Sequence, residues 1–98
     1  MLKPVKWSSF AEEDFAVVLE YLNNNWGNSV SLDFIEKTDR CILLIQKNPR
    51  QFPFLNKKLL IQKCVVTKHN SLYYRETEDR VEILRLYDTR QNPETLRF

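Results

Sequence analysis

CVVTKHNSLYYR (residues 64–75) and VEILRLY (residues 81–87) are the two runs that decide the fold of this chain. Both are short and rich in β-branched and aromatic residues, which is typical of strands. We expect strands over residues 59–69, 72–76 and 81–87. Asn70-Ser71 has the composition of a two-residue hairpin turn, and residues 77–80 have that of a longer one. The second half of the chain is therefore predicted to form three sequential antiparallel strands.

A helix is predicted upstream of these strands, over residues 10–25. Ser9 followed by Glu12 is a capping-box pattern, which marks a helix start. Gly27 is the only glycine of the chain and comes just after the last apolar position, where a backbone with positive φ ends a helix without a steric cost. The apolar residues that repeat at helical spacing are Phe15, Val18, Leu19, Leu22 and Trp26.

A second helix is predicted after Gly27. Ser29 or Ser31 can cap it, and Asn48-Pro49 ends it because proline has no N–H to donate. Two helices with so short a connection should pack as an antiparallel hairpin. The apolar positions of the second helix are Phe34, Ile35, Cys41, Ile42 and Ile45.

The start of the chain is predicted to add one more strand. Val5 and Trp7 alternate with Lys6 and Ser8 directly after Pro4, which suits a short strand with one buried face. The expected order is β-α-α-β-β-β. This is an α+β fold in which a helix hairpin packs on one face of a small, mainly antiparallel sheet, with the opening strand at an edge or in the middle.

Length and composition fit a single domain over residues 1–98. The chain is 43% apolar, enough for one core, and no Gly/Ser-rich tract marks a linker. It has no secretion signal and no apolar run long enough to cross a membrane, so we expect a cytoplasmic protein. Cys41 and Cys64 lie in apolar runs and are expected to be buried, reduced thiols. No cofactor motif or metal-ligand spacing is present, and we expect neither group.

Positive charge is concentrated in one stretch. The formal net charge is only +2, which does not by itself indicate nucleic acid. Residues 57–75, however, contain no acid, and they carry Lys57, Lys58, Lys63, Lys68 and Arg75. This distribution predicts a basic surface. The same lysines are also compatible with protection of an exposed strand edge.

The runs 64–75 and 81–93, together with the helix hairpin and the Asn48-Pro49 break, resemble the RelE/ParE toxin superfamily over nearly the whole chain. The resemblance implies the toxin component of a bacterial type II toxin–antitoxin module of the plasmid-stabilisation kind. Its partner would be an antitoxin that adds a helix or strand beside the helix hairpin and forms a hetero-oligomer with it. RelE-like members cut messenger RNA on the ribosome, whereas ParE-like members block DNA gyrase, and the fold cannot choose between them.

The RelE-like alternative would make the chain a metal-independent endoribonuclease, which needs a base, an acid and cationic donors at the phosphate. If residues 72–74 match the third strand of these nucleases, the arginine that they carry just before it falls at Ser71. A second family arginine matches Arg90, but the tail after it has no tyrosine or histidine. Under this alternative the catalytic candidates are Arg90, Arg75, His69 and Tyr87.

Two of these candidates have structural interpretations. His69 precedes the predicted turn, where a polar residue is commonplace, and we favour a structural role for it. Arg75 can face Glu82 across the predicted hairpin as an ordinary ion pair, and this interpretation stands level with phosphate binding.

The ParE-like alternative needs no catalytic residues, only a surface that grips gyrase, and Arg90 matches the arginine that follows the last strand in such sequences. The sequence favours it over the nuclease and over a third possibility, a non-toxic antitoxin-binding module. The candidates for target or nucleic-acid binding are Lys63, Lys68, Arg75, Arg85 and Arg90. Trp7, Tyr21 and Trp26 are candidate antitoxin anchors, although core packing is expected for each.

Overall fold

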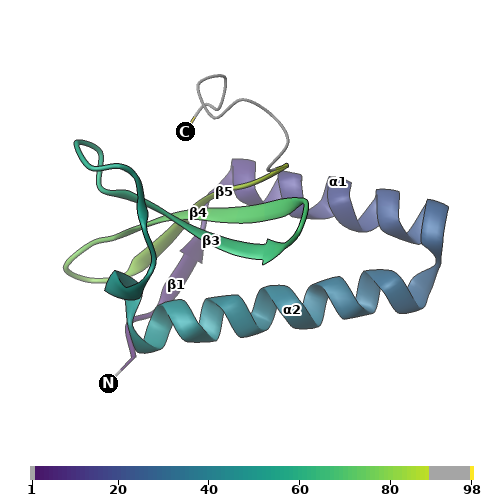
Figure 1. Cartoon of the computed structure of the whole chain (residues 1–98), viewed down its shortest axis with the longest axis horizontal. Helices are drawn as coiled ribbons and strands as arrows, with labels where there is room; N and C mark the ends of the chain where they lie inside the picture. Colours follow the sequence, from purple (N-terminus) through teal and green to yellow (C-terminus); the bar gives the residue numbers. More distant parts are fainter. Residues whose placement is uncertain (1, 89–97) are drawn as a thin grey trace.

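Two helices and a twisted sheet make up the fold (Figure 1). The computed structural model describes residues 2–88 and 98. Its elements, in chain order, are β1 (Val5–Trp7), α1 (Ser9–Trp26), α2 (Asn28–Lys47), the 3-10 helix η1 (Pro49–Gln51), β2 (Phe54–Asn56), β3 (Ile61–Thr67), β4 (Asn70–Glu76) and β5 (Val81–Asp88). The predicted α+β class and helix hairpin are confirmed. The short strand β2 was not among the predicted elements.

The strands of the sheet lie in the order β1-β5-β4-β3-β2. β1 runs parallel to β5, with Val5 opposite Val81, and the other neighbouring pairs are antiparallel. The opening strand therefore lies at an edge, one of the two expected places. Because β1 ends at Trp7, no strand among the described residues lies beside the second half of β5 on that side, and α1 packs there instead.

The start of α1 differs from the predicted capping box. Ser8, not Ser9, is the N-cap, and its hydroxyl accepts a hydrogen bond from the N–H of Ala11. The N–H of Ser8 donates to the carbonyl of Ile83 at 2.9 Å. Pairing with β5 thus holds Ser8 in the extended conformation that an N-cap requires.

Gly27 forms the whole connection between the helices. Its φ is +97°, as the positive-φ prediction required, and its N–H donates to the carbonyls of Leu22 and Asn23. α2 begins at Asn28 and not after Ser29 or Ser31. The Ser31 hydroxyl instead donates to the Asn28 carbonyl from within the helix.

The predicted turn at Asn70-Ser71 is wrong by two residues. Thr67 pairs with Asn70, so Lys68 and His69 form the turn, and Asn70 already belongs to β4. β3 is also shorter than predicted, because residues 57–60 form a turn in which Leu60 has a φ of +59°.

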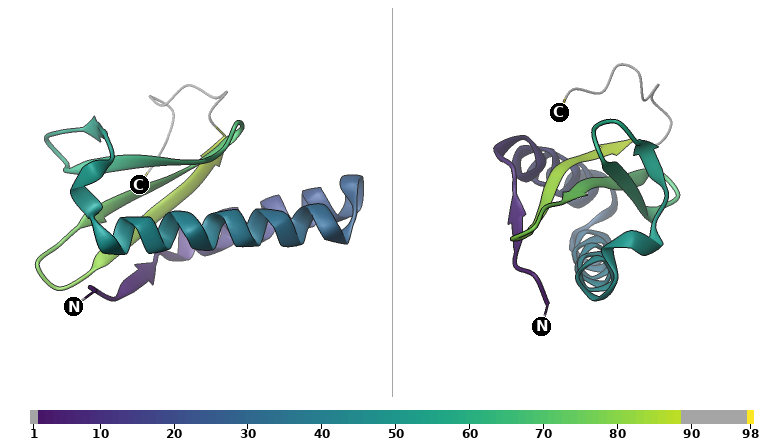
Figure 2. Two further views of the ribbon diagram at one scale, coloured as in Figure 1. Left: turned by 60° about the horizontal axis from the view of Figure 1, so that its bottom comes forward. Right: turned by 90° about the vertical axis from the view of Figure 1, so that its left-hand side faces the viewer.

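Both helices cover the same side of the sheet, as the end-on view shows (Figure 2). Trp7, Phe15 and Phe34 pack in a row: the Trp7 and Phe15 rings are tilted with centroids 5.3 Å apart, and Phe15 stacks on Phe34 with centroids 5.9 Å apart. Cys41 and Cys64 are both buried, as predicted. The buried apolar cluster on this side contains Ala11, Phe34, Cys41, Ile45, Cys64, Leu72, Tyr74, Val81, Ile83 and Leu86.

Candidate functional site

Most of the predicted site residues lie on the face of the sheet that the helices leave uncovered. Lys63, Tyr73 and Arg85 are direct neighbours on β3, β4 and β5, so their side chains share one face. Tyr73 is buried and packs with Ile61 in a second apolar cluster, which Leu55, Leu84 and Tyr87 border. Arg75 lies two residues along β4 from Tyr73, on the same face. We call the surface formed by Lys63, Tyr73, Arg75, Arg85 and Tyr87 the open face.

Arg85 is held by a carboxylate from α1. Its Nε donates to Oδ2 of Asp14 at 2.7 Å and its Nη2 donates to Oδ1 at 2.9 Å. Both side chains are mostly buried, with 16% of Arg85 and 18% of Asp14 exposed. The hydrogen bonds to Asp14 raise the pKa of Arg85 above its ordinary value. The guanidinium also lies over the rings of Phe10 and Tyr87, at 5.4 and 5.6 Å from their centroids.

Asp14 has a second role at the edge of β5. Its Oδ2 also accepts a hydrogen bond from the N–H of Leu86 at 3.2 Å. The hydroxyl of Ser8 similarly donates to the carbonyl of Leu84. Side chains from the first turns of α1 therefore satisfy backbone groups of β5 beyond the end of β1. Asp14 was not among the predicted site residues, because nothing in the local sequence pattern connects it to Arg85, 71 residues away.

Arg75 is paired too. It lies opposite Glu82 on β5, and its Nη2 donates to Oε1 of that residue at 3.3 Å. Arg80 donates to Oε2 of the same carboxylate at 2.8 Å. The hydrogen bond from Arg80, and after it the one from Arg75, lowers the pKa of Glu82. The cross-strand ion pair is thus present, and one carboxylate serves two guanidinium groups.

Lys68 and His69 lie away from the open face, in the turn between β3 and β4. The N–H of His69 donates to the hydroxyl of Thr67 at 3.3 Å, a local bond of the kind that stabilises turns. The structural role favoured for His69 stays a prediction. His69 does share one pocket beside α1 with Arg85, but Arg75 does not line that pocket.

Arg90 lies outside the described residues, so its predicted role stays a prediction. At the end of the sequence, the ring of Phe98 lies 5.9 Å from that of Tyr73, with the planes at 72°. The last residue of the chain therefore packs on the open face.

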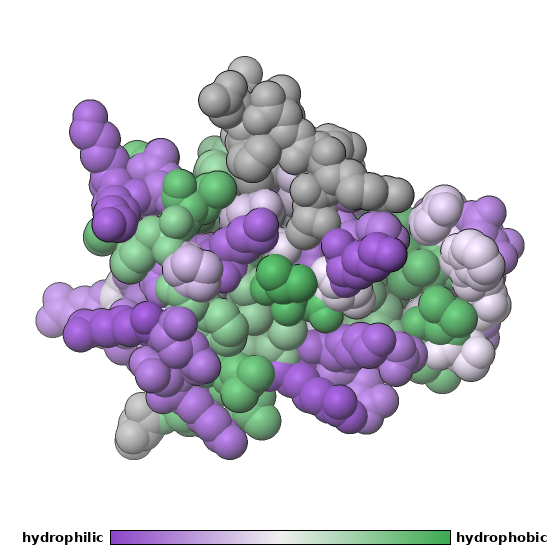
Figure 3. Space-filling view, in the orientation of Figure 1, coloured by the Kyte–Doolittle hydropathy of each residue, from purple (hydrophilic) through white to green (hydrophobic). Residues whose placement is uncertain are grey.

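A second feature is a groove along α1. It has a volume of about 910 Å³ and runs between α1 and the region where β5 ends and the Lys68-His69 turn lies. Val17, Tyr21 and Trp26 line it with 60%, 58% and 66% of their surfaces exposed. Figure 3 shows hydrophobic side chains among hydrophilic ones at the right-hand end of the molecule, where the two helices meet. We call this surface the α1 groove.

The α1 groove corrects two expectations. Core packing was expected for Tyr21 and Trp26, but both are exposed, whereas Trp7 packs against Phe15 as expected. The available signal was a second apolar stripe on α1. Phe10, Val17 and Tyr21 follow each other at helical spacing, away from the buried Ala11.

The described part of the chain offers neither a cluster of metal ligands nor a membrane-spanning helix. Among residues 2–88 and 98, no three His, Cys, Asp or Glu side chains are grouped so that they could hold a metal ion. In the same residues, neither helix is long and apolar enough to cross a membrane.

Comparison with known proteins identifies the fold. No family model and no curated protein matches the sequence. Among solved structures, a chain of the chromosomal ParDE TA system from P. aeruginosa superposes with a TM-score of 0.75 at 15% identity, covering 89% of this chain and 96% of that one. The YoeB/ParE toxin from Agrobacterium tumefaciens gives 0.63 at 14% identity, covering 87% and 96%. A chain of the E. coli DinJ-YafQ toxin-antitoxin complex gives 0.60 at 12%, covering 90% and 93%.

This chain has the RelE/ParE fold. Within that fold, Ser71 on β4 is the position at which the resemblance places a nuclease arginine. Ser71 is fully buried beside Tyr87, and its hydroxyl has no hydrogen-bond partner among the described residues. A buried serine cannot supply the positive charge that an arginine would bring to a phosphate.

Proposed function

We propose that this chain is the toxin component of a type II toxin–antitoxin module and that it inhibits DNA gyrase, as ParE-like toxins do. The likeness in fold to the ParDE chain supports the toxin assignment. Of the three structures compared above, that chain superposes with the highest TM-score.

The observation that carries the choice of gyrase is the pairing of the open-face arginines. Arg85 is bound by Asp14 through two hydrogen bonds, and Arg75 shares Glu82 with Arg80. A nuclease needs cationic donors aimed at the scissile phosphate. The negative charge of a carboxylate offsets the positive charge of the guanidinium it binds, so an arginine held as Arg85 is by Asp14 attracts a phosphate less strongly. Inhibition of gyrase requires a shaped surface and no such donors.

The open face still leaves a specific basis for the RelE-like alternative. Lys63 lies beside Tyr73 on this face, and none of the ion pairs found among the described residues includes it. Tyr87 on the same face could serve as a proton donor. The first experiment must therefore separate the two activities.

Controlled expression in bacteria is the test. We expect growth to stop with filamentation and DNA damage while translation continues, and we expect co-expression of the product of the adjacent open reading frame to restore growth. Purified protein should block supercoiling by gyrase. Early arrest of translation with cleaved messages would replace the proposal with the ribosome-dependent nuclease. Unaffected growth would contradict both toxic activities and would indicate a non-toxic antitoxin-binding module.

Substitution of Glu82 tests the charge argument directly. Glu82→Gln keeps the size of the side chain but removes the negative charge that Arg75 and Arg80 share. We expect the variant to bind single-stranded RNA several-fold more tightly at low salt. Its plot of log affinity against log salt concentration should be steeper by roughly 1, because each phosphate contact to single strands adds about 0.7 to the slope.

Glu36→Gln is the matched control. It changes the net charge equally, but it releases Arg40 on the exposed surface of α2, where 71% of the arginine side chain is already accessible. Its salt dependence should equal that of the unmodified protein. If the affinity of the unmodified protein for RNA already falls with salt as steeply as expected for Glu82→Gln, the open-face arginines bind phosphates despite their ion pairs. The pairing of these arginines would then no longer favour gyrase over RNA as the target.

The antitoxin is proposed to bind the α1 groove. The groove offers the exposed apolar side chains of Phe10, Val17 and Tyr21 at helical spacing, together with that of Trp26. Such a surface suits the apolar face of a partner helix. Exposed tyrosine and tryptophan side chains are also the residues that most often dominate binding energy.

A further inference from the structure

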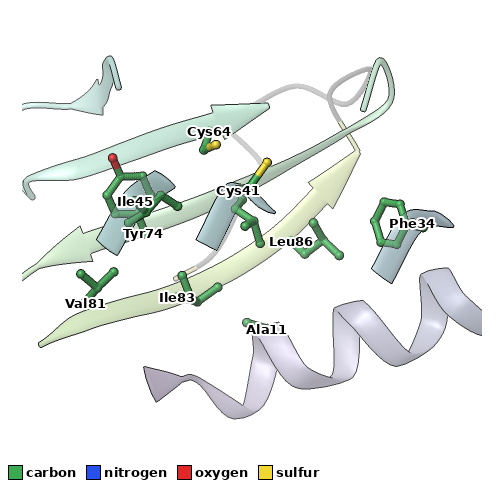
Figure 4. Close-up of a cluster of buried hydrophobic side chains, with 10 residues drawn as sticks. Ala11, Phe34, Cys41, Ile45, Cys64, Tyr74, Val81, Ile83 and Leu86 are labelled. Atoms are coloured by element: carbon green, nitrogen blue, oxygen red, sulfur yellow. The ribbon is translucent and has the colours of Figure 1, made fainter. Parts of the chain in front are cut away.

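Two cysteines from different layers of the fold meet in the core. Cys41 comes from α2 and Cys64 from β3, and both belong to the apolar cluster beneath the helices. Figure 4 draws their sulfur atoms near each other between α2 and β3, and each thiol shifts the pKa of the other. The Sγ of Cys41 also lies 3.5 Å from the carbonyl oxygen of Val65, the residue after Cys64.

The two thiols are not equivalent. Cys41 is 8% exposed and Cys64 is 3% exposed, so a small reagent reaches Cys41 first. The hydrogen bond from the Cys64 thiol lowers the pKa of Cys41, whereas the same bond and burial raise the pKa of Cys64. Cys41 is therefore the thiol that ionises first, and the thiolate is the form that reacts with oxidants.

We propose that Cys41 and Cys64 form a reversible dithiol–disulfide couple that responds to hydroperoxides and locks α2 onto β3. The Cys41 thiolate attacks one oxygen of hydrogen peroxide, the O–O bond breaks, and a sulfenic acid and hydroxide result. The Cys64 sulfur then displaces the sulfenic hydroxyl, which leaves with the Cys64 proton as water. Overall, two thiols and one peroxide give one disulfide and two waters, with two electrons passing from sulfur to oxygen.

The disulfide would join elements that are held together mainly by apolar packing. The segment that it closes runs from the middle of α2 through η1 and β2 to β3. A crosslink across such a segment stabilises the folded state chiefly by restricting the unfolded chain. Both cysteines lie on the helix side of the sheet, away from the open face, so this couple is independent of the proposed action on gyrase.

Treatment of the folded protein with hydrogen peroxide, followed by intact-mass and peptide analysis, tests the proposal. We expect a monomer lighter by two hydrogen atoms, with a peptide pair linked through Cys41 and Cys64. Its thermal unfolding midpoint should rise by several degrees and should return to the starting value after addition of dithiothreitol. Cys41→Ser and Cys64→Ser should each lose both the mass change and the shift in midpoint.

Unfolded protein provides the reference. In concentrated urea the two thiols should link under the same oxidant, which shows that the chemistry itself works. If the folded protein keeps both thiols, or if it gains oxygen atoms without forming the linked peptide, the couple does not exist and the two cysteines are ordinary core residues.

Discussion

Replacing Asp14 with alanine is expected to lower the free energy of unfolding by about 3 kcal/mol, because it leaves the positive charge of Arg85 without a partner in a largely buried site. The substitution leaves the Arg85 guanidinium without its two hydrogen bonds and leaves the N–H of Leu86 without its acceptor. Both losses occur where α1 covers the edge of β5. Urea denaturation followed by circular dichroism would measure the change, and the slope of the transition should stay constant.

Asp33→Ala is the matched control for this prediction. Asp33 pairs with Lys37 one turn along α2, where 57% of the aspartate side chain and 49% of the lysine side chain are exposed. An exposed pair of this spacing contributes at most about 0.5 kcal/mol. Equal losses from Asp14→Ala and Asp33→Ala would mean that the Arg85 pair is no stronger than a surface pair, and the charge argument for the open face would lose its basis.

The helix hairpin and the three long strands could be predicted because their signals are local. Gly27 and Asn48-Pro49 mark the ends of the helices, and the β-branched and aromatic runs mark the strands. β2 could not be found in the same way. It has three residues and lies directly after Pro53, so it has no period to detect, and it exists only because β3 offers an edge for pairing.

The errors at the turns have tertiary causes. Asn70-Ser71 has turn chemistry, but Leu72 and Tyr74 must face the helices, and the register that buries them places Asn70 inside β4. The shift from Ser9 to Ser8 as N-cap has the same kind of origin, because the partner that fixes Ser8 is Ile83 on β5. Local propensity was therefore enough to predict the helices and the long strands, whereas tertiary packing determines the residues at which they begin and end.

For the candidate site too, the sequence could indicate the residues but not the partners that they have in the fold. Strand alternation and pairing could bring Lys63, Arg75, Arg85 and Tyr87 into one region once the register was known. Whether the two arginines are available to bind a phosphate depends on Asp14 and Glu82. Only the folded structure shows that these two acids form ion pairs with them. A cation in a sequence is thus a weak indicator of phosphate binding until its partner is known.

The double substitution Tyr21→Ser and Trp26→Ser is expected to weaken antitoxin binding by on the order of 100-fold, because each aromatic anchor in such a groove contributes roughly 1 to 2 kcal/mol. Both side chains are mostly exposed in the unbound protein, so their loss should leave the unfolding free energy nearly unchanged. Calorimetry with the purified antitoxin measures the affinity. In cells, the variant should stay toxic and escape neutralisation by a level of antitoxin that silences the unmodified protein.

Leu32→Ser is the control for this prediction. Leu32 lies on α2 with 55% of its surface exposed, similar to Tyr21, but it does not line the α1 groove. A general loss of surface apolar area would weaken binding equally in both cases, whereas a groove-specific site predicts an effect only for the α1 pair. If the double variant keeps full affinity while Leu32→Ser loses it, the antitoxin binds α2, and the groove beside the sheet must have another use.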